Sequence, residues 1–142
     1  MLNIEIQGKL PSLDGFEFSN TFEKVARYME LSIKRNFAEG GRPQWQAKKD
    51  GSPSHLYISG ALFNTIGFEY GADFAEAGAM ALLPYSWVHQ AGFSGVKKNG
   101  VFMNMPARPY VMFQDEDIDW IAEQFSEDIL HYFDTHGEVI SA

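Results

Sequence analysis

The sequence predicts an α+β protein in which a mostly antiparallel sheet of about four to six strands packs against two long helices. Apolar residues recur at helical spacing over two long segments, residues 21–38 and 115–134. Between these segments, short stretches alternate apolar and polar side chains and are separated by turns that contain glycine. Because the 142 residues contain no linker-like segment and no repeat, we expect one domain over residues 1–142.

The first third of the chain predicts a strand, a long helix and a long loop. Residues 2–8 alternate apolar and polar side chains, which is typical of a half-buried strand. Asn20 and Glu23 have the spacing of a capping box at the start of the helix at 21–38. Residues 40–55 are mostly small, charged or turn-forming, as in a surface loop. We expect this loop to be mobile in an isolated subunit and ordered by a neighbouring subunit.

Short elements are expected between this loop and the last helix. In chain order they are a helix at 58–66, a hairpin at 67–77, a helix at 84–92, a hairpin at 93–104 and a strand at 108–113. The second hairpin contains Asn99-Gly100, the strongest short turn signal in the chain. Lys97 and Lys98 precede that turn, so this hairpin is predicted to have a basic tip.

The helix at 115–134 is predicted to bury one apolar face. Advancing 100° per residue gathers most of its apolar residues on one side: Ile118, Ile121, Ala122, Phe125, Ile129, Tyr132 and Phe133. Trp120 falls on the opposite side. An exposed tryptophan is typical of the centre of a protein interface, so Trp120 is predicted to contact another subunit. The alternative is that a loop of the same subunit covers its ring.

The charge distribution suggests contacts between subunits. The net charge is −8, which argues against nucleic-acid binding, whether general or sequence-specific. Residues 24–49 contain seven basic and two acidic side chains, whereas residues 114–142 contain nine acidic side chains and no Lys or Arg. These stretches are either solvated helix faces or a basic surface that meets an acidic surface on the next subunit.

The sequence offers no pattern for catalysis, cofactor binding or metal binding. There is no Cys, no phosphate-binding glycine motif and no nucleophile motif. His131 and His136 are five residues apart, so their rings would not converge on a metal from one helix. His89 is interpreted as a structural histidine. No apolar run approaches the roughly 18 residues of a membrane span, and residues 1–6 lack the pattern of a signal peptide. We therefore expect a soluble protein that is made in a cytoplasm.

Two single residues are further candidates for an interface. Pro106 and Pro109 stiffen the backbone around Arg108 and should present its side chain in one direction. That side chain either pairs with an acidic helix residue in its own subunit or contacts another subunit. Trp45 either anchors the loop at 40–55 to the body or contacts a partner. The interface candidates are Trp45, Arg108, Trp120, Lys97 and Lys98.

Four motifs occur in a characteristic order. They are Phe-x-x-Gly-Gly-Arg-Pro-x-Trp at 37–45, Ser-Gly-Ala-Leu at 59–62, His-Gln-x-Gly at 89–92 and Met-Pro-Ala-Arg-Pro-Tyr at 105–110, followed by an acidic helix. Over residues 20–134 this order resembles the phage virion morphogenesis, or tail completion, family. Tyr85-Ser86-Trp87-Val88 departs from the resemblance, because Tyr-Ala usually precedes the His-Gln element. The difference affects local packing and leaves the order of elements unchanged.

The resemblance implies a structural role in a phage or prophage virion, without enzymatic activity. The implied protein completes the tail or neck at the head–tail joint as a ring of identical subunits. Its partners would be further copies of itself and tail-tube or head-connector proteins. One alternative is a virion-associated hydrolase, which would need a cleft with two carboxylates about 5 to 9 Å apart. The other is a small monomeric binding module.

Overall fold

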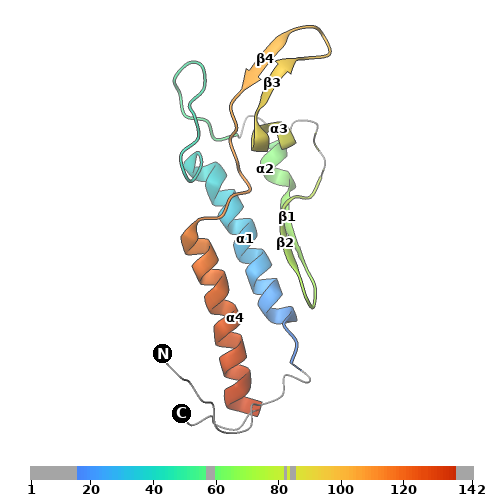
Figure 1. Cartoon of the computed structure of the whole chain (residues 1–142), viewed down its shortest axis with the longest axis vertical. Helices are drawn as coiled ribbons and strands as arrows, with labels where there is room; N and C mark the ends of the chain where they lie inside the picture. Colours follow the sequence, from blue (N-terminus) through green and yellow to red (C-terminus); the bar gives the residue numbers. More distant parts are fainter. Residues whose placement is uncertain (1–15, 57–59, 82, 84–85, 137–142) are drawn as a thin grey trace, which may run out of the picture.

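The protein is built around one long central helix. The computed structural model describes residues 16–56, 60–81, 83 and 86–136. Helix α1, Ser19–Glu39, lies between two neighbours. Helix α4, Asp115–His136, runs along one side of α1, and the hairpin of β1, Ile66–Tyr70, and β2, Ala75–Ala79, lies along another side (Figure 1).

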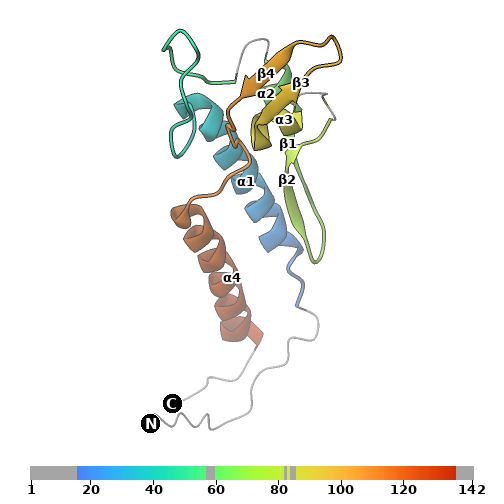
Figure 2. The ribbon, with the colours of Figure 1, turned by 45° about the horizontal axis from the view of Figure 1, so that its top comes forward.

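A second hairpin stands at the opposite end of the molecule from the far end of α4. The short helix α2, Ala61–Thr65, precedes β1, and α3, Ser86–Ala91, leads into β3, Phe93–Val96. Strand β4, Phe102–Met105, pairs with β3 in antiparallel register, with Phe93 opposite Met105 and Val96 opposite Phe102. Figures 1 and 2 show the β3–β4 hairpin projecting beyond the helices, at the same end as the loop at 40–55.

The core lies where α1 meets the first hairpin and the motif segments. Its buried apolar side chains are Ile33, Phe37, Trp45, Leu62, Ile66 and Tyr110. The Phe37 ring is surrounded by aromatic rings, with centroid distances of 5.9 Å to Trp45, 5.6 Å to Phe63 and 5.5 Å to Tyr110. Residues separated by more than 70 positions in sequence therefore share one cluster.

The α+β class is confirmed and the two long helices roughly fit the expectation, whereas the single sheet is wrong. The described strands form two separate two-stranded sheets, β1–β2 and β3–β4. The strand expected at 2–8 lies outside the described residues. Residues 108–113 join neither sheet, because the chain bends at Tyr110 and Val111 and its backbone groups there bind side chains. Asn36 Nδ2 donates to the carbonyls of Tyr110, at 2.7 Å, and Met112, at 3.1 Å.

The ends of α1 differ in how well the sequence predicts them. The helix begins at Ser19 without a side-chain cap, so the expected capping box is wrong, and Glu23 instead pairs with Arg27 at 3.0 Å. The C-terminus ends as expected at glycine. Gly40 adopts φ 71°, and Gly41 N–H donates to the Asn36 carbonyl at 2.7 Å.

The predicted buried face of the last helix is right in part: Phe125 packs on Phe22 of α1, with ring centroids 5.1 Å apart, whereas the start of the face is exposed. Ile118 is 55% exposed, whereas Asp117 is 1% exposed and faces α1. Asp117 and Ile118 are about 100° apart around the helix, so at its start the side of α4 that packs on α1 is rotated away from the predicted apolar face. Polar contacts across the helix pair explain this difference. Thr21 Oγ1 donates to Asp128 at 2.5 Å, and Lys24 Nζ pairs with the same carboxylate at 3.1 Å.

Candidate functional site

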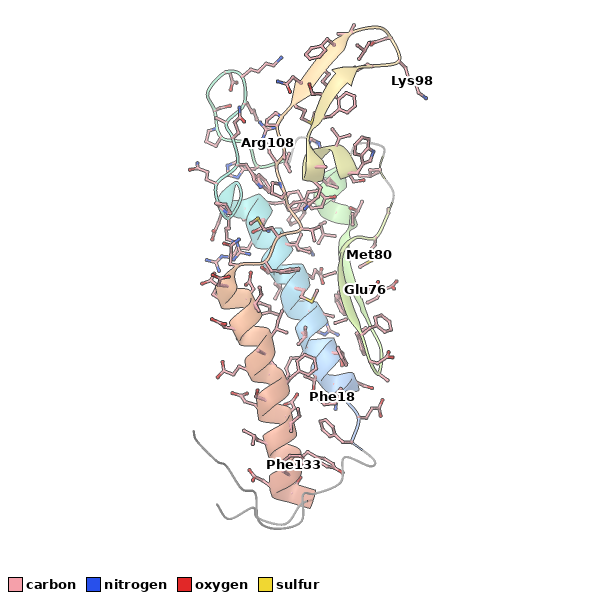
Figure 3. All side chains as sticks on the ribbon, viewed as in Figure 1. Phe18, Glu76, Met80, Lys98, Arg108 and Phe133 are labelled. Carbon is pink, nitrogen blue, oxygen red and sulfur yellow. The ribbon has the colours of Figure 1, made fainter. Side chains whose placement is uncertain are left out.

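Three of the four motifs meet in one place, which we call the motif junction. It consists of residues 40–47, residues 89–92 and residues 105–110. The motif junction lies at the base of the β3–β4 hairpin, where Figure 3 places Arg108. The following contacts show that these segments hold one another in position.

Arg108 fastens the loop at 40–55 to the motif junction. It is 9% exposed, and its Nε donates to the Gln46 carbonyl at 3.0 Å while Nη2 donates to the Ala47 carbonyl at 3.2 Å. Its own backbone N–H donates to the His89 carbonyl at 2.7 Å. The acidic helix residue expected as a partner is therefore not its partner. The stiff backbone around Arg108 directs a charged donor at two backbone carbonyls of the same subunit.

Trp45 is the anchor of the same loop. Its ring is buried against Phe37, and its Nε1 donates to the Pro109 carbonyl at 3.1 Å. A Cβ on Gly41 would lie 2.5 Å from the Trp45 ring, so only glycine leaves room for it. Residues 40–47 are thus held within the subunit, and the expectation that a neighbour orders the whole loop is wrong for this part.

The His-Gln-x-Gly motif supports the extended segment beside it. Gln90 Oε1 accepts the N–H groups of Tyr110, at 3.1 Å, and Val111, at 3.0 Å, and Gln90 Nε2 donates to the Val111 carbonyl at 2.9 Å. This amide therefore stands where a neighbouring strand would otherwise pair. Gly92 adopts φ 77°, and a Cβ there would lie 2.9 Å from the Ala107 nitrogen. A side chain at Gly92 would push the two motifs apart.

A buried carboxylate joins the start of α4 to α1. Asp117 accepts from Tyr28 Oη at 2.7 Å, from Ser32 Oγ at 2.8 Å and from the Gln114 N–H at 2.8 Å. The last contact also caps α4, as expected for an acid in the first turn. Arg42 Nη2 lies 3.6 Å from the same carboxylate. Asp117 and its three donors, with Arg42, are called the Asp117 network below.

Charge and hydrogen bonding keep Asp117 ionised. Burial acts to raise its pKa, but hydrogen bonds from Gln114, Tyr28 and Ser32 and the charge of Arg42 lower the pKa below its ordinary value. Burial, followed by the hydrogen bond to Asp117, raises the pKa of Tyr28. Tyr28 therefore remains a donor at neutral pH.

Trp120 lies on the side of α4 that faces α1. Its ring stacks on Tyr28 with centroids 4.0 Å apart and an interplanar angle of 12°, and its side chain is half-buried. This stack contradicts the expectation of an exposed Trp120 opposite the buried face. Trp120 therefore packs between α4 and α1 of the same subunit.

Lys97 and Lys98 occupy the exposed tip of the β3–β4 hairpin, as the turn signal predicted. The tip closes through the Gly100 N–H, which donates to the Lys97 carbonyl at 2.9 Å, and Gly100 adopts φ 82°. Figure 3 shows Lys98 pointing away from the body. Neither lysine forms an ion pair with a residue that the structure describes.

The described residues offer little for catalysis. Within them, no group of three or more His, Asp or Glu side chains could hold a metal ion. A shallow pocket is lined by Phe37, Ala38, His55 and Phe63, none of which is a carboxylate. Burial and then the charge of Arg108 lower the pKa of His89, which favours its neutral form. The described helices also include none long and apolar enough to cross a membrane.

Sequence reasoning missed the polar side chains that organise the fold. These are Asn36, Arg42, Gln90 and Asp117. Arg42 and Gln90 were visible only as members of motifs, and the charge pattern gave no reason to bury them. An acid in the first turn of a helix is expected to cap it, and that role accounts for only one of the three hydrogen bonds of Asp117.

Known proteins similar to this chain come from phages. The model of the phage virion morphogenesis family matches residues 8–129. A curated relative, Mu-like prophage FluMu G protein 2 of Haemophilus influenzae, is 32% identical over 109 residues, which cover 77% of this chain and 73% of the relative. No solved structure matches the chain. A family match over most of the chain, together with this relative, shows that the protein belongs to the phage virion morphogenesis family.

Proposed function

We propose that this protein is a structural, non-enzymatic component of the phage particle that completes the tail at the head–tail joint. It acts there as a ring of identical subunits and contacts tail-tube or head-connector proteins. It is made in the bacterial cytoplasm and becomes part of the virion. Membership of the virion morphogenesis family supports the general role.

The observation that carries this proposal is how the motif side chains are used. Arg108, Trp45 and Gln90 direct their polar atoms at backbone groups of their own subunit. Motif residues of an enzyme are expected to converge on a site where a substrate could react. Here the motif side chains fix the base of a projecting hairpin, as expected for a structural protein.

The charge distribution supports a ring. The hairpin tip carries Lys97 and Lys98, neither of which forms an ion pair with a described residue, whereas α4 carries eight acidic residues and no Lys or Arg. A ring requires that one patch of a subunit meets a different patch of its neighbour. Opposite charges at opposite ends favour such an arrangement over a two-fold dimer, in which like patches would meet.

Deletion of the gene from the phage or prophage that encodes it tests this function. The expected result is that full heads and full-length tails accumulate separately, and that supplying the protein restores joined particles. Negative-stain electron microscopy of the lysate provides the readout. Joined particles from the deletion, or a defect confined to cell-wall penetration, would contradict the proposal.

A further inference from the structure

The β3–β4 hairpin has exposed apolar side chains near its tip that no part of the described chain covers. Val96 and Phe102 are opposite each other in the strand register and are 65% and 66% exposed. Val101, beside them at the tip, is also exposed. A two-stranded hairpin alone is only marginally stable in water and gains stability when one face packs on a helix or sheet.

Helix α4 has an exposed apolar strip of the matching kind, called the α4 strip. Ile118 and Leu130 are 55% and 61% exposed, and Ala122 and the polar Ser126, which lie between them at intervals of four residues, are exposed as well. At 1.5 Å per residue, the strip from Ile118 to Leu130 is about 18 Å long. Two paired strands with their side chains are about 10 Å wide, so the hairpin fits within that length.

The polar borders of the two surfaces have opposite charge. Lys97 and Lys98 flank the apolar face of the hairpin. Asp119, Glu123 and Glu127 recur on one side of α4, next to the α4 strip, and form no ion pair within the part of the chain that the structure describes.

A subunit cannot join these surfaces by itself. The hairpin projects at one end of the molecule, whereas α4 extends to the other end, where Figure 3 labels Phe133 (Figures 1 and 3). The motif junction fixes the base of the hairpin through Gly92 and Arg108 and holds it in this projecting position.

We infer that the β3–β4 hairpin of one copy docks on the α4 strip of the next copy, with Phe102 and Val96 against Ile118 and Ala122. The lysines at the tip then face the acidic border of the helix. This contact is heterologous and repeats from copy to copy, so it closes a ring where the rotation between copies permits. The inference rests on the proposed ring and assigns the surfaces that build it.

Cysteine cross-linking between full-length chains tests this docking directly, because the protein contains no Cys. Asn99→Cys marks the hairpin tip and Ala122→Cys marks the α4 strip. A short bis-maleimide added to a mixture of the two variants is expected to give covalent dimers that contain one chain of each. The double variant is expected to give a ladder of covalent oligomers. Glu76→Cys, at an exposed position of β2 on another side of α1 from α4 (Figures 1 and 3), replaces Ala122→Cys in the control and is expected to give no dimer.

Three outcomes would overturn the inference. They are the absence of mixed dimers, a cross-link within one chain of the double variant, and protection of the Ala122→Cys thiol from alkylation in a demonstrated monomer. Protection would show that the α4 strip is covered inside its own chain.

A second experiment tests the docking of the hairpin on α4 separately from the formation of a ring. Phe102→Ser is expected to weaken self-association at least about tenfold, as measured by sedimentation of the full chain. The pair Lys97→Glu and Lys98→Glu is expected to weaken it too, and Glu123→Lys with Glu127→Lys in the same chain to restore it. Assembly that none of these variants changes would refute the docking and leave the ring in place. Unjoined heads and tails after gene deletion would still support the proposed function.

Discussion

Removing the carboxylate of Asp117 is expected to cost more stability than any other single change to an acidic side chain of α4. Asp117→Ala leaves the Tyr28 and Ser32 hydroxyls and the Gln114 N–H without their acceptor. It also leaves Arg42 without its closest buried counter-charge. The Asp117 network joins α1, α4 and the turn at Arg42, so removing the carboxylate weakens contacts in three segments at once.

The magnitude follows from burial and from the number of broken contacts. Breaking one side of a buried charge pair costs about 3–5 kcal/mol. Tyr28 is only half-buried, so its hydroxyl can regain water, which favours the lower end of that range. We therefore expect Asp117→Ala to lower the free energy of unfolding by about 3 kcal/mol. A typical domain has about 5–15 kcal/mol in total.

Urea unfolding followed by tryptophan fluorescence measures this loss, at one fixed protein concentration because association also stabilises the fold. Asp134→Ala is the matched control, since Asp134 lies on the same helix, is exposed and is not assigned to the docking surface. It is expected to change stability by less than about 0.5 kcal/mol. If the two variants lost the same stability, the structural role given to the Asp117 network would be refuted.

Three further predictions concern pH, backbone space and the loop. Because the pKa of Asp117 is lowered in the folded protein, the stability that its ionised form contributes is fully present above the unfolded pKa of about 4 and is lost as pH falls. The difference in free energy of unfolding between the parent and Asp117→Asn, measured by urea titration, should therefore narrow below about pH 4. A difference that widens there would be inconsistent with a lowered pKa of Asp117. Gly92→Ala should destabilise the protein by at least about 1 kcal/mol more than Gly100→Ala. Both glycines have positive φ, but an added Cβ meets the backbone only at Gly92. Equal thermal-unfolding midpoints of the two variants would count against the close approach of Gly92 to the Ala107 backbone. Limited proteolysis of a monomer should cut the loop at 40–55 only within residues 48–53. Arg108→Ala should extend cleavage to residues 46 and 47, because Arg108 binds their carbonyls. Identical fragments from the parent and the variant would show that Arg108 does not hold the loop in place.

The long helices were predictable because their apolar residues recur at helical spacing, but the orientation of α4 was not. Apolar periodicity identifies the buried face only when burial is driven by apolar contact. Here Asp117 and Asp128 face α1, where Ser32, Thr21 and Lys24 meet them. The face with the most apolar residues is therefore left partly exposed.

The motif junction could be anticipated in its parts but not in its arrangement. Proline and glycine positions marked the stiff and tight segments, and Trp45 is the loop anchor that was one of its two predicted roles. The expected strand at 108–113 failed because Asn36 and Gln90 satisfy its backbone with side-chain amides. An amide that pairs with a distant backbone has no local signature, since any polar helix position could carry it.

The position of the protein in a joined virion is the most direct test of the proposed ring at the head–tail joint. Cryo-electron microscopy of purified particles, with the chain located by a fused tag or by fitting the structure, would show where its copies lie. We predict a single ring of copies at the head–tail joint, with the β3–β4 hairpin of each copy on α4 of the next. Copies distributed along the tail or at its distal end, or their absence from the joint, would contradict it.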